Sequence, residues 1–408
     1  MSTKCSVFGL SNSTIENHAL LSVIDSMTGR SIRPFSESSR EVVNRLSARL
    51  VRLRDTPQFV ALGFWLRQAS VERLKESFMS RLPNGHFPVP RGLAFHLPPA
   101  NVDTIFVYSW ALSLLAGNVN VVRLPSSRPP HLDFLIHTLV ETLEEVGCND
   151  GNIFCSYGKE SSLTRDISLR SDLRVVWGGD SKVNEIAEYR IKPDGLSIGF
   201  PDRKSLAVIN SARYETLDSG SRDLLAERLY NDIFWFDQMA CGSPRVVAWV
   251  GDRTTCADLS SEFYGRLASM AIKKGYSVEV GLALSKFGFL NEALASGSSS
   301  KAAMIGNELS VFDLVESNVK PPETIVGGGL LGHVAFRALT DLGHLVNHKT
   351  QTISYFGFNR DELECLVATL VGKGGFRIVP VGQALVFDST WDGVPFLEHM
   401  TRRITLTL

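Results

Sequence analysis

Residues 104–124, TIFVYSWALSLLAGNVNVVRL, decide what kind of fold this chain adopts. The first nineteen of them carry no charged side chain, which is long enough for a crude membrane-span pattern. Gly117-Asn118 interrupts the run with a helix-stop signal, and buried asparagines would be costly in lipid. We therefore predict a buried helix over 103–116 and a buried strand over 119–124, as in an α/β core, and no membrane span.

The same alternation continues on both sides of this stretch and sets the fold class. Apolar runs of strand length are separated by segments with helical spacing, which predicts parallel, doubly wound sheets. The first set of expected strands covers 93–97, 119–124, 152–156, 173–177 and 205–209. The second set covers 245–250, 276–280, 324–326, 352–357 and 376–381. We predict an α/β fold with two doubly wound domains and a break near residues 210–217.

A helical segment precedes the first strand. Ser38 and Glu41 form a capping-box pattern, apolar residues recur after them at helical spacing, and Thr56-Pro57 restarts the chain into a second helix. The stretch 295–300, ASGSSS, has the composition of a mobile loop or lid. The expected domains are a nucleotide-binding domain with this helical segment over 1–211, a catalytic domain over 212–385 and a C-terminal arm over 386–408.

Composition places the chain among ordinary globular proteins. Its 408 residues are 44% hydrophobic and 21% charged, and at roughly 150 residues per domain they predict two or three domains. Lys and Arg number 42 against 43 Asp and Glu, so we expect no nucleic-acid partner. The six cysteines include no C-x-x-C pair and the histidines show no ligand spacing, so we expect no metal site. The first residues show no long apolar segment or cleavage signature, which predicts a reduced, cytoplasmic setting.

Two motif matches do not fit their structural context. Gly195–Gly199 has the G-x-S-x-G spacing of serine hydrolases, but Pro201 follows and blocks the helix that this motif requires. Gly327–Gly332 has dinucleotide-binding spacing, but the acidic residue expected about 20 positions later is absent. We interpret Ser197 as a coincidental match and the glycines as a tight turn.

The stretch 237–245, DQMACGSPR, has the clearest chemical content. A single cysteine between Ala and Gly is more often a small buried residue than a nucleophile. Cys241, however, lies in a turn of Gly, Ser and Pro directly before an expected strand, and loops at strand ends and domain junctions carry the chemistry of α/β enzymes. We predict that Cys241 is the nucleophile. The cysteines interpreted as packing residues are Cys148, Cys155, Cys256 and Cys365.

Several segments, in order, resemble the aldehyde dehydrogenase superfamily. They are HLPPAN at 96–101, LAGNVNVVRLPS at 115–126, NIFCSYG at 152–158, DLRVVWGGDSKV at 172–183 and the cysteine segment at 237–246. The resemblance implies that superfamily's two-domain fold, a C-terminal arm used in oligomer formation, and Asn101 as an oxyanion contact. It also implies a nicotinamide cofactor bound by Leu97, Pro98, Pro99, Ala100, Arg123, Ser126, Ser127, Gly178, Gly179, Asp180 and Val183.

A closer resemblance is to the bacterial acyl-CoA reductases of the bioluminescence type. Eight blocks follow that family's order: FHLPPANV, LLAGNVNVVRL, VVWGGD, GFPDRKSLAVI, DIFWFDQMACGSP, KTQTISYFG, RIVPVGQALVF and WDG. The resemblance aligns Phe200 with the Glu that activates water in hydrolytic aldehyde dehydrogenases. Without that base the thioacyl-enzyme would react poorly with water, which agrees with thioester reduction. The turn at 327–333 also lacks the carboxylate that the superfamily often uses to hold the nicotinamide ribose.

The function implied is NAD(P)H-dependent reduction of an acyl-CoA or acyl-carrier thioester to an aldehyde. Cys241 would attack the carbonyl carbon, and Asn101 with the Cys241 backbone N–H would hold the oxyanion, where one such donor is typically worth about 3 kcal/mol. Arg123, or Arg128, beside the serines would suit a 2′-phosphate, which favours NADPH while leaving NADH open.

Other functions stay open at this point. The same skeleton would suit an acyl-phosphate reductase or a CoA-acylating aldehyde dehydrogenase, or a non-catalytic subunit that presents acyl groups to another enzyme. The expected partners are an acyl thioester, an acyl-protein synthetase or acyl carrier, and further copies of the chain in a homo-oligomer. The sequence does not fix the acyl chain length.

Overall fold

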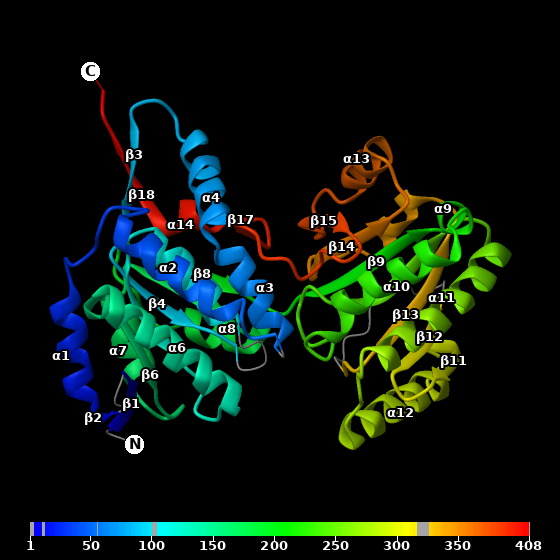
Figure 1. The fold of residues 1–408 in the computed structure, drawn as a ribbon, viewed down its shortest axis with the longest axis horizontal. Coiled ribbons are helices and arrows are strands. Elements are labelled where there is room, and N and C mark those ends of the chain that lie inside the picture. Colours follow the sequence, from blue (N-terminus) through cyan, green and yellow to red (C-terminus); the bar gives the residue numbers. More distant parts are fainter. Residues whose placement is uncertain (1–3, 10–12, 55, 100–103, 316–325, 408) are drawn as a thin grey trace. The chain divides into compact units, whose positions relative to one another are not determined.

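The computed structural model describes residues 4–9, 13–54, 56–99, 104–315 and 326–407. The chain forms two compact units, each with a sheet flanked by helices (Figure 1). Unit 1 comprises Met1–Pro201 and Phe387–Leu408, and unit 2 comprises Asp202–Val386. The expected α/β class is confirmed. The chain passes between the units after residues 201 and 386, compared with the expected boundaries after 211 and 385.

Unit 1 is built on a seven-stranded sheet in the order β2-β1-β6-β5-β4-β7-β8. Five strands are parallel: β4 (Leu93–Leu97), β5 (Val119–Arg123), β6 (Asn152–Ser156), β7 (Leu173–Trp177) and β8 (Leu196–Phe200). The chain adds β5 and β6 on one side of β4 and then β7 and β8 on the other. The strand order therefore reverses between β4 and β7. In open α/β sheets, ligands bind beyond the carboxyl ends of the strands at such a reversal.

The stretch 104–124 forms the helix and strand that its sequence predicts. Helix α5 (Ile105–Leu115) is buried at every residue, and β5 follows it across a turn at Gly117. An all-round apolar helix is a core helix when protein covers all its faces. Among the residues that the structure describes, no helix combines the length and the apolar character that crossing a membrane requires.

Further helices of unit 1 lie before the C-terminal arm. They are α1 (Asn17–Met27), α2 (Glu37–Leu50), α3 (Pro57–Leu66), α4 (Gln68–Ser80), α6 (Pro130–Val146), α7 (Leu163–Arg170) and α8 (Asp180–Ala187). The helical segment and its restart at Pro57 are confirmed, but the predicted cap is wrong. Ser36, whose backbone is extended, caps α2 and accepts the Ser39 N–H at 3.2 Å, so Ser38 lies inside the first turn. Strands β1 (Lys4–Phe8) and β2 (Ser13–Glu16) were not predicted.

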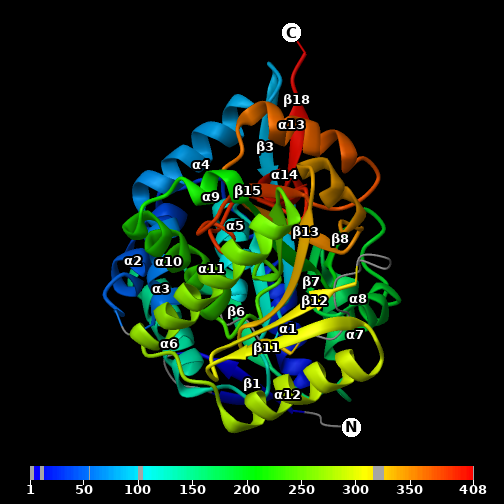
Figure 2. The same ribbon diagram turned by 90° about the vertical axis from the view of Figure 1, so that its right-hand side faces the viewer.

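The C-terminal residues return to unit 1. They form β16 (Thr390–Trp391), β17 (Val394–Pro395), α14 (Phe396–Met400) and β18 (Thr401–Thr405). Strand β18 pairs antiparallel with β3 (His86–Pro90), as Figure 2 shows. The Tyr108 hydroxyl donates to the Asp388 carbonyl at 2.6 Å, which ties this arm to α5.

Unit 2 is built on a second seven-stranded sheet in the order β11-β12-β13-β10-β9-β14-β15. The strands are β9 (Lys204–Asn210), β10 (Pro244–Val250), β11 (Ser299–Ile305), β12 (Leu309–Leu314), β13 (Leu330–Phe336), β14 (Thr350–Phe356) and β15 (Arg377–Pro380), and only β11 is antiparallel to its neighbour. The helices are α9 (Ser211–Glu215), α10 (Ser219–Phe234), α11 (Arg253–Lys273), α12 (Val280–Ala295) and α13 (Arg360–Thr369).

Four sequence predictions in this half are wrong or fall outside the described residues. The expected strand 276–280 is absent, because Val280 opens α12 and is 78% exposed instead of facing a sheet. The expected loop 295–300 is only a short turn, since β11 already begins at Ser299. Residues 205–209 form β9 of the second sheet and not a strand of the first. Of 324–326, the first two residues lie outside the described ranges and the third is not in a strand.

Candidate active site

The cysteine loop, residues 237–243, connects α10 to β10 in unit 2. Because β10 runs parallel to β9 and β13, this loop lies at the amino edge of the sheet. Cys241 is half-buried in it. Burial raises the pKa of the thiols of Cys5, Cys155 and Cys256, which keeps them protonated and poor nucleophiles.

The side chain of Gln238 fixes one end of the cysteine loop. Its Nε2 donates to the carbonyls of Pro244 and Leu330 at 2.8 and 3.0 Å, and its Oε1 accepts the Leu330 N–H at 3.0 Å. Gln238 is completely buried, so no water competes for these groups. Asp237 and Gln238 both have positive φ, 48° and 62°. Such left-handed backbone at non-glycine residues persists only where surrounding contacts hold it, which is what the three hydrogen bonds do.

A turn of three glycines, residues 327–329, contacts the same end of the cysteine loop. Gly328 donates its N–H to the Asp237 carbonyl at 2.9 Å, and a Cβ at Gly327 would lie 2.5 Å from that oxygen. The ammonium of Lys286, a buried residue, donates to three carbonyls, those of Asn307, Glu308 and Gly328. Strand β13 follows the turn directly, so no helix opens there and the dinucleotide motif does not apply. The prediction of a tight glycine turn is confirmed.

The other end of the cysteine loop is held from β9 and from the turn before the C-terminal arm. Ser205 donates its hydroxyl to the Cys241 carbonyl at 2.7 Å. A Cβ at Gly242 would lie 2.7 Å from the Ala384 carbonyl, so the loop approaches that turn too closely for a side chain. Asp232 holds the turn by accepting the N–H groups of Gly382 and Ala384 at 2.6 and 2.9 Å.

Arg245 is a charged group that interacts electrostatically with Cys241. Its side chain is almost fully buried, and Nη2 donates to the Gln238 carbonyl at 3.0 Å. Burial lowers the pKa of Arg245 to about 10, while the charge of the Cys241 thiolate opposes that change. Because electrostatic coupling is reciprocal, the guanidinium stabilises the thiolate of Cys241. The sequence reasoning assigned no role to Gln238, Arg245 or Lys286, since their partners are backbone groups that composition cannot reveal.

The predicted oxyanion residue cannot be placed. Asn101 and the predicted cofactor residue Ala100 lie outside the described residues. The oxyanion role of Asn101 therefore stays a prediction.

The remaining predicted cofactor residues gather at the carboxyl edge of the unit 1 sheet. Pro98 and Pro99 follow β4, Arg123 ends β5, Ser126 and Ser127 are exposed after it, and Gly178, Gly179 and Asp180 join β7 to α8. Leu97 and Val183 pack in the hydrophobic cluster beneath this edge, so their side chains serve the core. The ends of β4 and β7 are the point where the strand order reverses, which is where a dinucleotide binds in such sheets.

Lys182 spans this reversal and was missed by the sequence reasoning. Its Nζ donates to the Pro98 carbonyl at 3.3 Å, and its stem runs over Gly178. Gly178 has φ 158°, and a Cβ there would lie 2.8 Å from Lys182 Cδ. The N-cap of α8 is Gly179, which supplies no side-chain cap to the first N–H groups. A cation, a bare glycine turn and an uncapped helix start are what a dinucleotide phosphate requires, so the residues fit this cofactor class.

Two arginines were candidates for a 2′-phosphate, and the structure separates them. The Arg123 guanidinium lies over the Tyr157 ring at 4.7 Å from its centroid and donates weakly to the Tyr157 carbonyl at 3.4 Å. Arg128 instead forms an ion pair with Asp133 at 2.7 Å and lies over the ring of Phe8. A guanidinium that already forms an ion pair with a carboxylate would bind a phosphate less strongly. Arg123 is therefore the better candidate for binding a 2′-phosphate.

Phe200 and Ser197 both lie on β8. Phe200 is 3% exposed and packs against both Trp177 and Phe396, with ring centroids 4.1 and 5.1 Å away. Ser197 accepts a hydrogen bond at 3.0 Å from Nε of Arg174, on the neighbouring strand β7. The interpretation of Ser197 as a coincidental motif match is confirmed, because no strand–turn–helix surrounds it.

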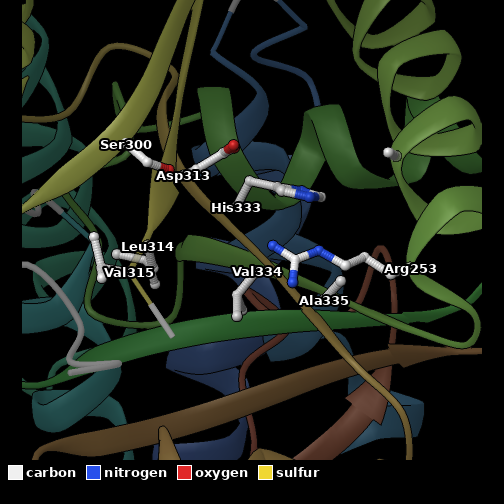
Figure 3. Close-up of a pocket in the computed structure, with 9 residues that line it drawn as sticks. Arg253, Ser300, Asp313, Leu314, Val315, His333, Val334 and Ala335 are labelled. Carbon is white, nitrogen blue, oxygen red and sulfur yellow. The ribbon is translucent and has the colours of Figure 1, made fainter. Parts of the chain in front are cut away.

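Unit 2 also contains a hollow of about 480 Å³ at the carboxyl ends of β12 and β13. Figure 3 shows Arg253 reaching from α11 towards β13, beside Asp313 and His333. Since the cysteine loop precedes the amino end of β10, this hollow lies at the opposite edge of the same sheet. It therefore belongs to a different part of unit 2 from Cys241.

Comparison with known proteins confirms the resemblance that the sequence predicts. Residues 75–274 match the family model described as acyl-CoA reductase (LuxC). The chain is 26% identical over 180 residues to a long-chain acyl-protein thioester reductase of Aliivibrio fischeri, in a match that covers 42% of this chain and 35% of that protein. The matches span about a third of the length of the curated relatives.

Solved structures with the same fold are aldehyde dehydrogenases. Aldehyde dehydrogenase 21 from Physcomitrella patens, in complex with succinate, is similar at a TM-score of 0.66 and 12% identity, over 96% of this chain and 89% of that one. Glyceraldehyde-3-phosphate dehydrogenase from Methanocaldococcus jannaschii, complexed with NADP, is similar at a TM-score of 0.65 and 11% identity, over 96% and 94%. The chain has an aldehyde-dehydrogenase-like fold, as predicted.

Proposed function

We propose, on the premise that residues 75–274 match the acyl-CoA reductase family, that this chain reduces an acyl thioester to an aldehyde. In the balanced reaction a thioester, a reduced nicotinamide and a proton give an aldehyde, a thiol and the oxidised nicotinamide. The observation that carries the proposal is the cysteine loop: a half-buried cysteine beside a buried guanidinium, on a backbone fixed by a fully buried glutamine. That arrangement favours a thiolate held in one position.

The first half of the reaction uses the cysteine loop. The Cys241 thiolate attacks the thioester carbonyl carbon, and the tetrahedral adduct then expels the substrate thiolate, which takes up a proton. Asn101 and the Cys241 backbone N–H are proposed as the oxyanion donors, and one such donor is typically worth about 3 kcal/mol. Ser205 and Gln238 support this step because they hold the loop backbone on both sides of the nucleophile.

The second half requires a cofactor at the unit 1 edge. A bound reduced nicotinamide would supply the hydride to the thioacyl carbonyl carbon. Pro98, Gly178, Lys182 and Arg123 would bind the phosphates and adenosine, because they surround the strand-order reversal. The thiohemiacetal on Cys241 then loses its hydroxyl proton, its C–S bond breaks, and the aldehyde and the cysteine thiolate are released.

Water is a poor competitor for the acyl group in this proposal. The resemblance aligns Phe200 with the base of hydrolytic aldehyde dehydrogenases, so this position supplies no carboxylate, and the side chain packs with Trp177 and Phe396 in the core of unit 1. General-base assistance usually supplies about 10²–10⁴-fold in rate. Without it, the thioacyl-enzyme would persist until the hydride arrives.

Arg123 favours NADPH over NADH as the cofactor, because its guanidinium lies at the carboxyl edge and its contacts there, within the part of the chain that the structure describes, are the ring and carbonyl of Tyr157. The similar protein of Aliivibrio fischeri is named for long-chain acyl-protein thioesters, so we extend the proposal to long acyl chains. A donor or partner protein, a homo-oligomer and a cytoplasmic setting remain proposals from the sequence.

The test is to incubate the full chain with NADPH and a panel of acyl-CoA, acyl-carrier and acyl-phosphate donors. The expected result is aldehyde and NADP⁺ in equal amounts from thioesters, with no product from a Cys241→Ala variant. Faster turnover of acyl phosphates would favour the acyl-phosphate reductase. Faster aldehyde oxidation onto CoA would favour the CoA-acylating dehydrogenase. An acyl adduct that NADPH never releases would favour the non-catalytic subunit.

A further inference from the structure

Lys182 stands out because its side chain joins two strand ends at the carboxyl edge of the unit 1 sheet. Its Nζ reaches from the first turn of α8, over Gly178, to the Pro98 carbonyl at the end of β4. The Pro98 carbonyl is a neutral acceptor, so this contact does not itself neutralise the ammonium charge. The contact joins the two strand ends between which the strand order reverses.

Charges of both signs lie near Lys182. Arg123 at the end of β5 and Lys159 in the turn after β6 both repel its ammonium. Glu185, one turn further along α8, attracts it, and Asp180 lies in the first turn of the same helix. Burial is the largest effect, and together with Arg123 and Lys159 it lowers the pKa of Lys182 to about 8.

A half-buried ammonium with Arg123 and Lys159 nearby is suited to an anionic ligand. A phosphate at the strand-order reversal would replace the Pro98 carbonyl as the acceptor and would also neutralise Arg123. Charge-assisted hydrogen bonds to phosphate are stronger than bonds to a neutral carbonyl, so the exchange favours the bound state.

We propose that Lys182 is a phosphate-binding residue of the cofactor site, and that cofactor affinity therefore falls as the solution becomes alkaline. The inference rests on the proposed function, since it takes the dinucleotide as the ligand. Lys182 must carry its proton to bind the phosphate. The bound phosphate in turn holds the proton on Lys182 over a wider pH range, so binding takes up a proton from solution near pH 8.

The test is titration calorimetry of the full chain with NADPH and with NADH between pH 7 and 9.5, in two buffers of different ionisation enthalpy. The expected dissociation constant of the wild type is about tenfold weaker at pH 9 than at pH 7, with an uptake of about half a proton at pH 8. Lys182→Arg should bind with little dependence on pH, because a guanidinium keeps its charge throughout this range. Lys182→Met, which keeps the stem over Gly178, should bind about tenfold or more weakly at pH 7. Lys75→Met on α4 is the matched control and should behave as the wild type.

The comparison of cofactors identifies the phosphate. A pH dependence shared by NADPH and NADH assigns Lys182 to the pyrophosphate, and one confined to NADPH assigns it to the 2′-phosphate; both support the proposal. Wild-type affinity and pH dependence in Lys182→Met, with unchanged circular dichroism, would overturn it. A wild type that binds neither cofactor at pH 7 would instead overturn the proposed function, so the two failures are distinguishable.

Discussion

Replacing Gln238 with alanine should loosen the cysteine loop without touching Cys241. The side chain makes three hydrogen bonds to backbone groups of Pro244 and Leu330, and all of it is buried. At about 1 kcal/mol for each net hydrogen bond, the loss is about 3 kcal/mol of local stability. Because 1.4 kcal/mol corresponds to a factor of ten, the Leu330 amide should exchange about 100-fold faster.

Hydrogen exchange followed by mass spectrometry measures this change directly. Peptides that cover 237–250 and 327–336 should lose protection in Gln238→Ala, and peptides from unit 1 should not. The alkylation rate of Cys241 by iodoacetamide at fixed pH should change in the same variant, because the thiolate no longer has one position beside Arg245. Gln68→Ala, at an exposed residue that opens α4, is the matched control. Unchanged protection of 327–336 in Gln238→Ala would show that the loop is not held as described.

Three further predictions concern single residues. Arg245→Met should move the pH midpoint of Cys241 alkylation upwards by about one unit or more, because the cation that stabilises the thiolate is lost. Arg245→Lys keeps a cation and should leave the midpoint close to that of the wild type. Equal midpoints in all three proteins would show that Arg245 does not stabilise the thiolate. Phe200→Glu should cost about 3 kcal/mol or more of unit 1 stability in urea unfolding and should not speed hydrolysis of the acyl-enzyme, because it places a carboxyl group in an aromatic stack. Phe134→Glu, at a 52% exposed position on α6, is the control for the Phe200 variant. Faster deacylation in Phe200→Glu would contradict the prediction, because it would place residue 200 next to the acyl group. Arg123→Ala should reduce the ratio of kcat/KM for NADPH to kcat/KM for NADH about tenfold, whereas Arg128→Ala should change this ratio little. Equal kcat/KM for the two cofactors in the wild type would refute the NADPH assignment.

The fold was predictable where a local pattern decides it. Residues 104–124 carry both the apolar helix and the strand, separated by a glycine with φ 86°, so their sequence needs no distant partner to be interpreted. The segment 276–280 shows the opposite case. Its alternation suits a strand, but no neighbouring strand pairs with it, and Val280 opens a helix with its side chain in solvent. Pairing is a tertiary property that alternation alone does not supply.

The residues of the candidate site also differ in whether a local sequence pattern predicts them. The position of Cys241 in a loop directly before a strand was predictable, because Gly, Ser and Pro beside it are a local signal. The contacts of Gln238 and Lys286 were not, since their most distant acceptors lie 92 and 42 residues away along the chain. The sequence contains one indication for Lys182. It is the third residue of the helix that follows the glycine turn, a position near the strand ends where cofactor phosphates bind in such sheets.

The central claim is that a thioester acylates Cys241 and that hydride then releases the acyl group as an aldehyde. The most direct measurement is peptide mass spectrometry of the full chain after incubation with a long-chain acyl thioester, followed by a chase with deuterium-labelled NADPH. The account predicts one acyl adduct on the peptide containing Cys241, stable without cofactor, and release on the chase as an aldehyde that carries one deuterium. An adduct on another cysteine, persistent acylation of Cys241→Ala, or release of the acyl group as free acid without NADPH would contradict it.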